Sequence, residues 1–412
     1  MIYKKDANDV WNGVQRLRAS DIRIGDRFGS DVAVDGDFLV VGARYQDYDE
    51  NNTNQVNSAG AAYVYKKGAD DIWTETQKIV PSHRGYGDDI GKSVSIHGDY
   101  ITLASKSDTD AANVNTINGN GSVFVFKKDA DDFWAEVQKL KPGNGVQYSE
   151  FGYGDVSISE DYIAVGAKNL DLYDDNWYYG HVYLFKKDGD GVWNESQIIR
   201  TPYPASNFGS GVSLDNNLLL VSAPNSSVEN NGSNISNVGL SYLFLKNAND
   251  EWVLAETIQA SQVVANSYIG GGQYDATEST YAVAVDNNHF ILGAQPTTRI
   301  VDNTTYYNAG TAYISGNVED LGLLDVLDVE DNLLGSVKLY PNPIKNKLNI
   351  HLTKTYTNIK VYISNILGKT FLEKEFKNLN NIKIDFNFPK GIYLTKITLE
   401  NKSAEVVKLI KN

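Results

Sequence analysis

The sequence predicts an all-β protein with a body of repeated four-stranded units and a small C-terminal β-sandwich. The first observation is the composition of the 412 residues, with 26 Tyr, 14 Phe, 6 Trp and 35 Gly. Aromatic residues favour strands, and glycine marks turns. The second is a tryptophan-containing segment that recurs about every 60 residues. The third is a change of charge along the chain, which places a domain boundary near residue 337.

The plainest repeat is a strand, a short acidic turn and a tryptophan. The tryptophans, at intervals of 62, 61, 59 and 59 residues, are Trp11, Trp73, Trp134, Trp193 and Trp252. The segments that end on them read YKKDANDVW, YKKGADDIW, FKKDADDFW, FKKDGDGVW and FLKNANDEW. A period of this length is typical of repeat architectures. A tryptophan at one position of every unit indicates packing between units rather than a platform for a ligand.

Three more features complete the unit before each later tryptophan. An alternating strand opens on a residue pair such as Phe28-Gly29, and it meets a tight polar turn such as Asp35-Gly36-Asp37. A second, apolar strand ends in a small pair such as Gly42-Ala43. Apolar runs that flank an Asp/Asn/Gly turn predict a β-hairpin. A long polar loop and a glycine-led strand, GAAYVY in the first copy, follow, so each unit holds four strands.

A four-stranded unit that repeats, and that cannot bury both faces alone, predicts the blades of a β-propeller. A fifth, degenerate copy at residues 282–294 and its glycine-led strand from Gly310 have no tryptophan strand after them. The N-terminal segment supplies one. We therefore expect residues 3–11 and the following VQRLRA to complete the last of about five blades. The alternative is that a longer protein has lost its first repeats, of which this segment is the remainder.

These units resemble known repeats. The run FGSDVAVDGDFLVVGA, followed by the glycine-led strand and the tryptophan, resembles FG-GAP repeats, the units of integrin-α-type β-propellers. The resemblance covers residues 1–316 and implies a propeller for adhesion and ligand binding. Some FG-GAP blades hold calcium between their first two strands with a D-x-D-x-D-G pattern, and calcium needs about six to eight oxygen ligands. Here that connection is only three residues long, so we expect neither the family's calcium site nor another cofactor.

The longer loops carry further acidic residues, which we interpret as solvated charges rather than metal ligands. They are Asp47, Asp49, Glu50, Asp108, Asp110, Asp171, Asp174 and Asp175.

The last 76 residues differ in composition from the body. Residues 337–412 hold 14 Lys and 5 acidic residues, a net charge of +9, whereas the 23 basic and 47 acidic residues of the remainder give −24. Residues 317–336 are acidic and leucine-rich and are interpreted as a linker. The strands predicted after it are KLNIHL, NIKVYISN, KTFLEKEF, IKIDF, GIYLTKITLE and AEVVKLIK. Their alternation and spacing predict a small β-sandwich.

This C-terminal segment resembles the type A C-terminal sorting domain of the type IX (Por) secretion system. The residues that carry the resemblance are Tyr340, Pro341, Asn342, Pro343, Gly368, Gly391, Tyr393 and Lys408. The resemblance implies a passenger that the outer-membrane secretion machinery exports to the surface of a Gram-negative bacterium, or releases. The alternative is an ordinary β-sandwich in which the Pro-Asn-Pro turn occurs by coincidence.

Several classes of function find no support in the sequence. There is no cysteine, which removes disulfides, thiolate metal sites and cysteine nucleophiles. The acidic body disfavours nucleic acid, and no apolar run is long enough to span a bilayer as a helix. Neither a metal-binding histidine pair, a G-x-S-x-G elbow nor a phosphate-binding loop is present. We identify no catalytic residue and no metal ligand.

Three hypotheses about function remain open from the sequence. The first is a non-enzymatic binding or adhesion protein whose loops contact a glycan or a protein; the aromatic loop Tyr173, Trp177, Tyr178 and Tyr179 is its candidate contact region. The second is a secreted hydrolase with acidic residues on the loops or at the centre of the propeller. The third is a structural fragment of a larger adhesin.

Overall fold

The computed structural model describes most of the chain and shows an all-β protein. The described residues are 1–107, 121–143, 150–168, 180–200, 207–230, 233–259, 268–275, 278–286, 289–294, 299–301, 304–306, 311–314, 337–340, 344–365, 370–399 and 405–411. Every regular element within these ranges is a strand. They form two compact units, Met1–Phe244 with Ile258–Ile314, and Leu245–Thr257 with Ser315–Asn412. The predicted linker 317–336 lies outside the described residues.

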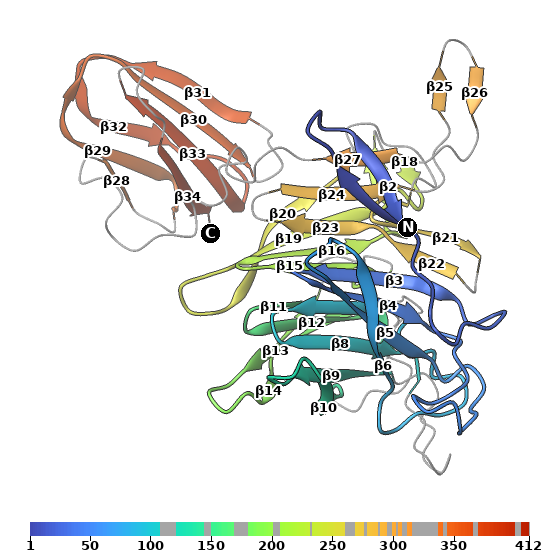
Figure 1. Cartoon of the computed structure of the whole chain (residues 1–412). Helices are drawn as coiled ribbons and strands as arrows, with labels where there is room; N and C mark the ends of the chain where they lie inside the picture. The colour runs from blue at the N-terminus through green and yellow to red at the C-terminus, as the bar shows by residue number, and fades with distance from the viewer. Residues whose placement is uncertain are drawn as a thin grey trace. The chain divides into compact units, whose positions relative to one another are not determined.

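Four four-stranded sheets confirm the predicted repeat unit (Figure 1). The first is β3 (Phe28–Asp35), β4 (Phe38–Ala43), β5 (Ala61–Lys67) and β6 (Trp73–Ile79). The second is β7 (Val94–His97), β8 (Tyr100–Ser105), β9 (Ser122–Lys128) and β10 (Trp134–Leu140). The third is β11 (Phe151–Ser159), β12 (Tyr162–Ala167), β13 (His181–Lys187) and β14 (Trp193–Arg200). The fourth is β15 (Val212–Asp215), β16 (Leu218–Ala223), β19 (Leu240–Lys246) and β20 (Trp252–Ile258). Four-stranded sheets of this kind are the blades of a β-propeller.

The fifth copy is less regular. Its hairpin is β23 (Val283–Asp286) and β24 (His289–Ala294), and its glycine-led strand is β27 (Thr311–Ile314), which pairs with β24. The same sheet holds β21 (Gly271–Asp275) and β22 (Glu278–Tyr281). Two short hairpins stand in loops: β17 (Val228–Asn230) with β18 (Ser233–Ile235), and β25 (Arg299–Val301) with β26 (Thr304–Tyr306).

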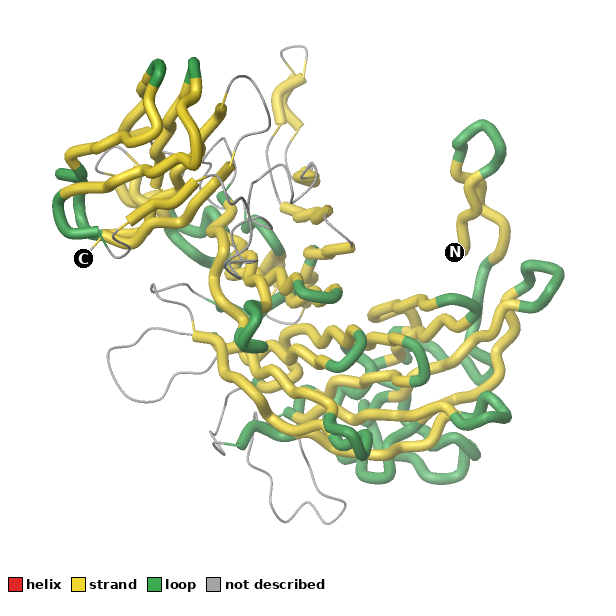
Figure 2. The backbone as a smooth tube through the Cα atoms, turned by 90° about the vertical axis from the view of Figure 1, so that its left-hand side faces the viewer, coloured by secondary structure: helices red, strands yellow, loops and turns green. Residues whose placement is uncertain are grey.

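The N-terminal segment does not complete this fifth sheet as predicted. Among the described strands, β2 (Trp11–Gln15) pairs only with β1 (Ile2–Lys5), and the two form a separate hairpin (Figure 2). The reason is visible in the repeat. β1 is equivalent to the end of a glycine-led strand, which is the strand that pairs with the tryptophan strand in the other units. It therefore occupies the edge of β2 with which β27 would have to pair. The acidic turn holds this partner in place, because Asp6 accepts hydrogen bonds from the N–H groups of Asn8 and Val10.

Consecutive sheets pack face to face through apolar side chains. One cluster joins Val40 and Val64 of the first sheet to Ile101 and Trp134 of the second. A second cluster joins the second sheet to the third in the same way. The packing interpretation is confirmed for Trp134, Trp193 and Trp252, which are buried, whereas Trp73 is half-buried and Trp11 is exposed. The rings of Trp134 and Phe38 meet edge to face with centroids 5.6 Å apart.

The first sheet is covered differently from the others. On one side it packs against Leu17 and Ala19 of the N-terminal segment. On its first strand, Val32 and Val34 are 61% and 62% exposed. The residues at the equivalent positions of the next three sheets are at most 7% exposed; they are Val94, Ile96, Val156, Ile158, Val212 and Leu214.

A glutamine four residues after the tryptophan ties the first sheet to the second and the second sheet to the third. The Nε2 of Gln77 donates to the carbonyl of Trp134 at 2.8 Å, and the N–H of Trp134 donates to Oε1 of Gln77 at 2.9 Å. Gln138 holds Trp193 with the same two bonds, at 2.7 and 2.8 Å. Gln15 likewise holds Trp73, at 2.7 and 2.9 Å. The strand β2 therefore contacts the first sheet through the same pair of hydrogen bonds with which β6 contacts the second sheet.

The glycine that leads the third strand of each unit lies against the backbone of the next sheet. A Cβ placed on Gly121 would be 1.8 Å from the carbonyl oxygen of Phe151, and one on Gly180 would be 1.6 Å from that of Phe208. Neither glycine has a positive φ, so the requirement at these two positions is room rather than backbone freedom. Two sequence anchors, the leading glycine and the Phe-Gly pair, thus meet across the boundary between sheets.

The C-terminal residues form the predicted β-sandwich with its own core. One sheet is β28 (Val337–Tyr340), β29 (Lys347–Tyr356) and β32 (Leu379–Asp385). The other is β31 (Thr370–Phe376), β30 (Ile359–Asn365), β33 (Gly391–Leu399) and β34 (Glu405–Lys411). The buried cluster between them includes Leu348, Ile350, Val361, Ile397 and Leu409. Every residue of this cluster lies within 344–409, so the sandwich encloses its core with its own strands.

Candidate functional site

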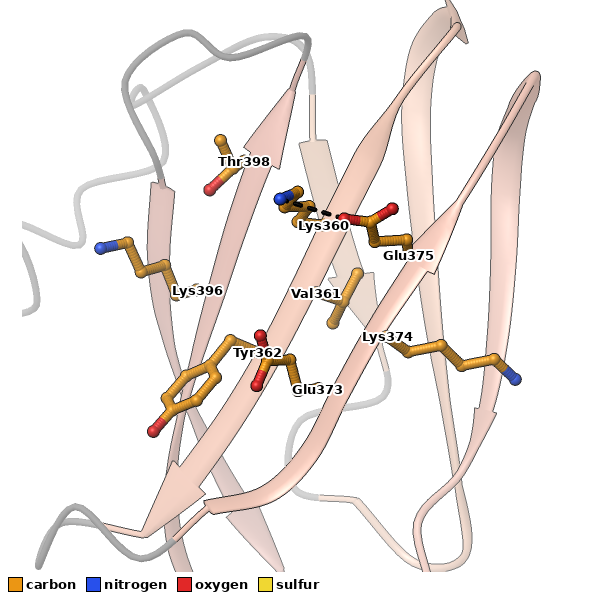
Figure 3. Close-up of a pocket in the computed structure, with 8 residues that line it drawn as sticks. All are labelled: Lys360, Val361, Tyr362, Glu373, Lys374, Glu375, Lys396 and Thr398. Atoms are coloured by element: carbon orange, nitrogen blue, oxygen red, sulfur yellow. Dashed lines mark ion pairs between the residues drawn. The ribbon is translucent and has the colours of Figure 1, made fainter.

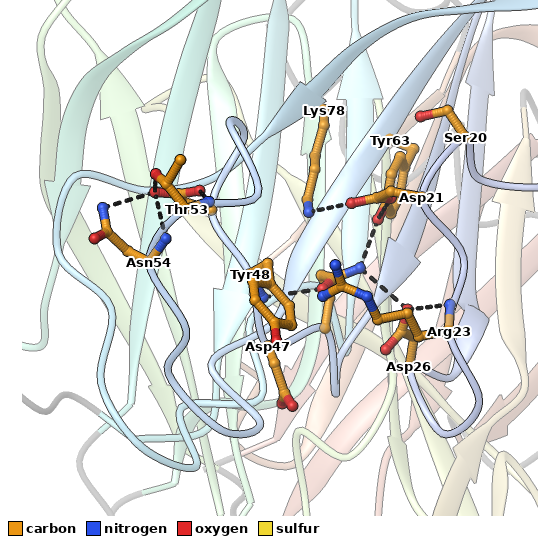
Figure 4. Close-up of polar contacts among 12 residues, drawn as sticks. Ser20, Asp21, Arg23, Asp26, Asp47, Tyr48, Thr53, Asn54, Tyr63 and Lys78 are labelled. Atoms are coloured by element: carbon orange, nitrogen blue, oxygen red, sulfur yellow. Dashed lines mark hydrogen bonds and ion pairs between the residues drawn. The ribbon is translucent and has the colours of Figure 1, made fainter.

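The loop between the second and third strands of the first sheet is held by its own acidic residues (Figure 4). The carboxylate of Asp49 accepts the N–H of Thr53 at 2.8 Å and the Nδ2 of Asn54 at 2.7 Å. Although desolvation opposes it, these bonds lower the pKa of Asp49 to about 2. Asp47 accepts the N–H of Ser58 at 2.8 Å. The prediction of solvated charges is therefore wrong for Asp47 and Asp49, whereas Glu50 is exposed.

A polar network anchors the base of this loop to the N-terminal segment (Figure 4). The hydroxyl of Tyr63 donates to Asp21 at 2.5 Å, and Lys78 pairs with the same carboxylate at 2.7 Å. The buried Nε2 of Gln46 donates to the Tyr63 hydroxyl at 2.8 Å and to Asp26 at 3.1 Å. Burial and the hydrogen bond to Asp21 raise the pKa of Tyr63. The phenol therefore remains a hydrogen-bond donor, and the network fixes the loop in place.

Asp31 and Asp155, on the first strands of the first and third sheets, flank Ser93, which directly precedes the first strand of the second sheet. Ser93 Oγ donates to Asp155 at 2.5 Å and accepts the N–H of Val156 at 3.1 Å. Asp31 accepts the N–H of Val94 at 2.7 Å. The pKa of Asp31 is raised by desolvation and by the charge of Asp155, and desolvation raises that of Asp155. Because each carboxyl group accepts a hydrogen bond from the neighbouring sheet, this group stabilises the contact between sheets.

This pair predicts a pH dependence of stability. A carboxyl group with a raised pKa binds protons more tightly in the folded state, so the free energy of unfolding falls as the pH rises through the raised values. Both side chains are partly exposed, and solvent screens part of the effect. We expect the pair to lower the urea midpoint at about pH 8 relative to about pH 5.5, whereas Lys92 and Lys168, whose pKa values are lowered by burial, act in the opposite sense. Asp31→Asn should flatten this difference, whereas the exposed control Glu50→Gln should retain it. An unchanged slope in Asp31→Asn would contradict the assignment.

No group of three or more His, Cys, Asp or Glu side chains suited to a metal ion occurs among the described residues. In the part of the chain that the structure describes, no helix has the length and apolar character needed to cross a membrane. A groove of about 280 Å³ lies on the four-stranded sheet of the C-terminal sandwich (Figure 3). Lys360 and Glu375 form an ion pair of 3.0 Å at this groove, and its lining mixes both signs of charge.

The structure places only part of the residues singled out in the sequence. The aromatic loop residues Tyr173, Trp177, Tyr178 and Tyr179 lie outside the described residues, as do Pro341, Asn342, Pro343, Gly368, Asp108, Asp110, Asp171, Asp174 and Asp175. Tyr340 ends β28 and is 50% exposed. Gly391 opens β33, and Lys408 lies on β34 opposite Leu394.

Tyr393 has a defined structural role in the sandwich. It is buried, and its hydroxyl donates to the carbonyl of Pro389 at 2.7 Å. Its ring packs edge to face against Phe371 and Phe386, with centroids 5.1 Å apart in both pairs. The predicted motif residue therefore belongs to the core of the sandwich.

Sequence reasoning missed Gln46, Asp21 and the group of Asp31, Ser93 and Asp155. A signal for the group was present, because polar residues closely follow the Phe-Gly pair, or the equivalent Ile90-Gly91 pair, in the first three units, as in FGSD, IGKS and FGYGD. Which of those side chains face a neighbouring sheet depends on the register, which the sequence alone does not reveal.

Comparison with known families agrees with this geometry. The model of the FG-GAP repeat matches residues 11–65, 73–126 and 134–185. The model of the secretion system C-terminal sorting domain matches residues 338–412. Among curated proteins, none matches the chain. Each FG-GAP match starts at a repeat tryptophan and ends in the third strand of the following sheet. The sequence unit is thus offset by one strand from the sheet.

Proposed function

We propose that this chain, which carries three FG-GAP repeats and a type IX sorting domain, is a non-enzymatic binding protein of the bacterial surface or its surroundings. The observation that carries the proposal is a sorting domain with a core of its own, attached to a body whose loops stand on a rigid repeated frame. Binding sites are common on loops that a rigid scaffold positions. In this proposal the ligand is a glycan or a protein, and no calcium is required.

Export through the sorting domain is the first part to test. In a bacterium that has a type IX secretion system, the full chain should become accessible to added protease or antibody. A chain that ends at residue 336 should be retained inside the cell. The core cluster of the sandwich contains no residue of the body, so the shortened chain should remain folded. Equal surface exposure of both chains would overturn the proposal for export.

Binding is the second part. The purified full chain should bind at least one member of an array of surface glycans and matrix proteins. A hydrolase would instead require converging acidic groups that remain available for a substrate. Asp31 and Asp155 are one pair of interacting acidic groups, but both accept backbone N–H groups. A hydrolase would be favoured over a binding protein if the chain hydrolysed a polysaccharide or peptide library and the variant Asp155→Asn did not.

A further inference from the structure

The first sheet leaves open a face that the following sheets bury. In the second sheet, Val94 and Ile96 of the first strand lie in one apolar cluster with Val40 of the first sheet. Their equivalents in the first sheet, Val32 and Val34 of β3, are 61% and 62% exposed. These two valines, which we name the first-sheet face, therefore lie where a preceding sheet packs in the units that follow.

The backbone at this face is open as well. A Cβ built on Gly91 of the second sheet would be 2.4 Å from the carbonyl oxygen of Ala61, and one on Gly209 of the fourth sheet would be 2.6 Å from that of His181. Both glycines belong to the Ile-Gly or Phe-Gly pair of their unit, and both lie against the preceding sheet. Gly29 is their equivalent in the first sheet, and nothing lies within 4 Å of a Cβ built on it.

The fifth sheet exposes the opposite half of this contact. Ile291 of β24 is 41% exposed. All four residues at its position in the preceding sheets are 0% exposed; they are Val40, Thr102, Ala164 and Leu220. In the first sheet this residue packs on the second sheet, so Ile291 occupies a position that packs on a following sheet.

The neighbouring strand of the fifth sheet shows the same difference. Ala312 of β27 pairs with Gly293 as Ala62 of β5 pairs with Gly42, so the two alanines are equivalent. Ala312 is exposed. All four of its equivalents are 0% exposed; they are Ala62, Val123, Val182 and Ser241. We name Ile291 and Ala312 the fifth-sheet face.

The two faces are the two halves of the contact that recurs between consecutive sheets. The fifth-sheet face holds the positions that pack on the first strand of a following sheet, and the first-sheet face is such a first strand. Both halves are exposed in the same chain, so the chain does not cover one with the other. Removing apolar surface from water is favourable by roughly 25 cal/mol per Å². A second molecule can therefore cover each face with packing that the body already uses four times.

We propose that the first-sheet face of one copy of this chain binds the fifth-sheet face of a second copy. The contact joins two different surfaces, so each dimer still carries one free face of each kind and can add further copies head to tail. The inference goes beyond the proposed binding function and does not depend on it. The chain has a net charge of −15, so repulsion between copies opposes the contact, and added salt should strengthen it.

Sedimentation of the full chain at about 1 to about 200 µM tests the contact, because this range covers the affinities of small interfaces. We expect the average mass to rise with concentration, and to rise further when sodium chloride is increased from about 50 to about 500 mM. Val34→Lys and Ile291→Lys each alter one face, and each should weaken association at least about tenfold. Both side chains are exposed, so both variants should fold, which circular dichroism checks. The matched control is Val137→Lys, since Val137 is 51% exposed on the edge strand β10; it should associate as the parent does.

A mixture of the two variants separates this contact from any other. Val34→Lys retains the fifth-sheet face and Ile291→Lys retains the first-sheet face, so the mixture should form a dimer with one copy of each variant and grow no further. Self-association of either variant alone, at the strength of the parent chain, would indicate a different or symmetric contact and overturn the inference. A parent chain that stays monomeric over the whole range would overturn it too, whether the two faces meet within one molecule or another segment covers them. Binding to the glycan and protein array is measured separately and is not affected by either result.

Discussion

Gly180→Ala is expected to destabilise the body by at least about 3 kcal/mol. The added methyl group would lie 1.6 Å from the carbonyl oxygen of Phe208 and 2.6 Å from its carbonyl carbon. Backbone atoms cannot move aside as a flexible side chain does, so the third and fourth sheets would have to separate. The loss should be visible as a lower urea midpoint and a lower melting temperature.

The control for this prediction is Gly189→Ala, in the turn that follows the same strand. Nothing lies within 4 Å of a Cβ built on Gly189, and its equivalents in other repeats are Ala7, Ala69 and Ala130. This variant should keep the stability of the parent protein. Comparable stability of Gly180→Ala and Gly189→Ala would show that the close approach of the two sheets does not contribute to the fold.

Trp193→Ala is expected to cost about 3–5 kcal/mol, because a large buried ring is lost and a cavity remains. Trp193 is 2% exposed, and its ring meets that of Tyr100 edge to face with centroids 5.5 Å apart. Trp11→Ala is the matched variant at the equivalent position of the first copy, where the side chain is 65% exposed. It should change the free energy of unfolding by no more than about 0.5 kcal/mol.

Chemical denaturation of both tryptophan variants checks this difference. A ligand platform would give the opposite pattern, with binding lost in both variants and stability nearly unchanged. Equal destabilisation by the two substitutions would contradict the exposure of the N-terminal hairpin.

The four-stranded unit and the C-terminal sandwich could be predicted because their signals are local. Apolar alternation, the polar turn after Asp35 and the glycine-led strand all lie within one hairpin or its neighbour. The alternation of apolar residues likewise predicted the strands β29 to β34 of the sandwich, whereas the short strand β28 was not predicted. Closure of the fifth sheet was a long-range prediction, and it failed because β1 competes with β27 for the same edge of β2.

The candidate site was harder to predict for a related reason. An acidic loop residue looks the same in the sequence whether it faces water or its own backbone, as Glu50 and Asp49 illustrate. The Gln four residues after each of the first four tryptophans and the cation after the small pair of the first three sheets were visible as patterns. Their meaning depends on which sheet each side chain reaches, and that is set by the packing of whole sheets.

The first sheet is more exposed than the sheets that follow it, and this difference should affect which part of the body unfolds first. In an array of stacked sheets, stability is about the sum of each sheet's own stability and its contacts with neighbours. A sheet whose first strand exposes Val32 and Val34 lacks part of one such contact. Stability should therefore form a gradient along the chain, with amide protons of β3 exchanging earlier than those of β11. The same end would be the first that a protease enters, while the third sheet, buried on both faces, keeps its protection longest.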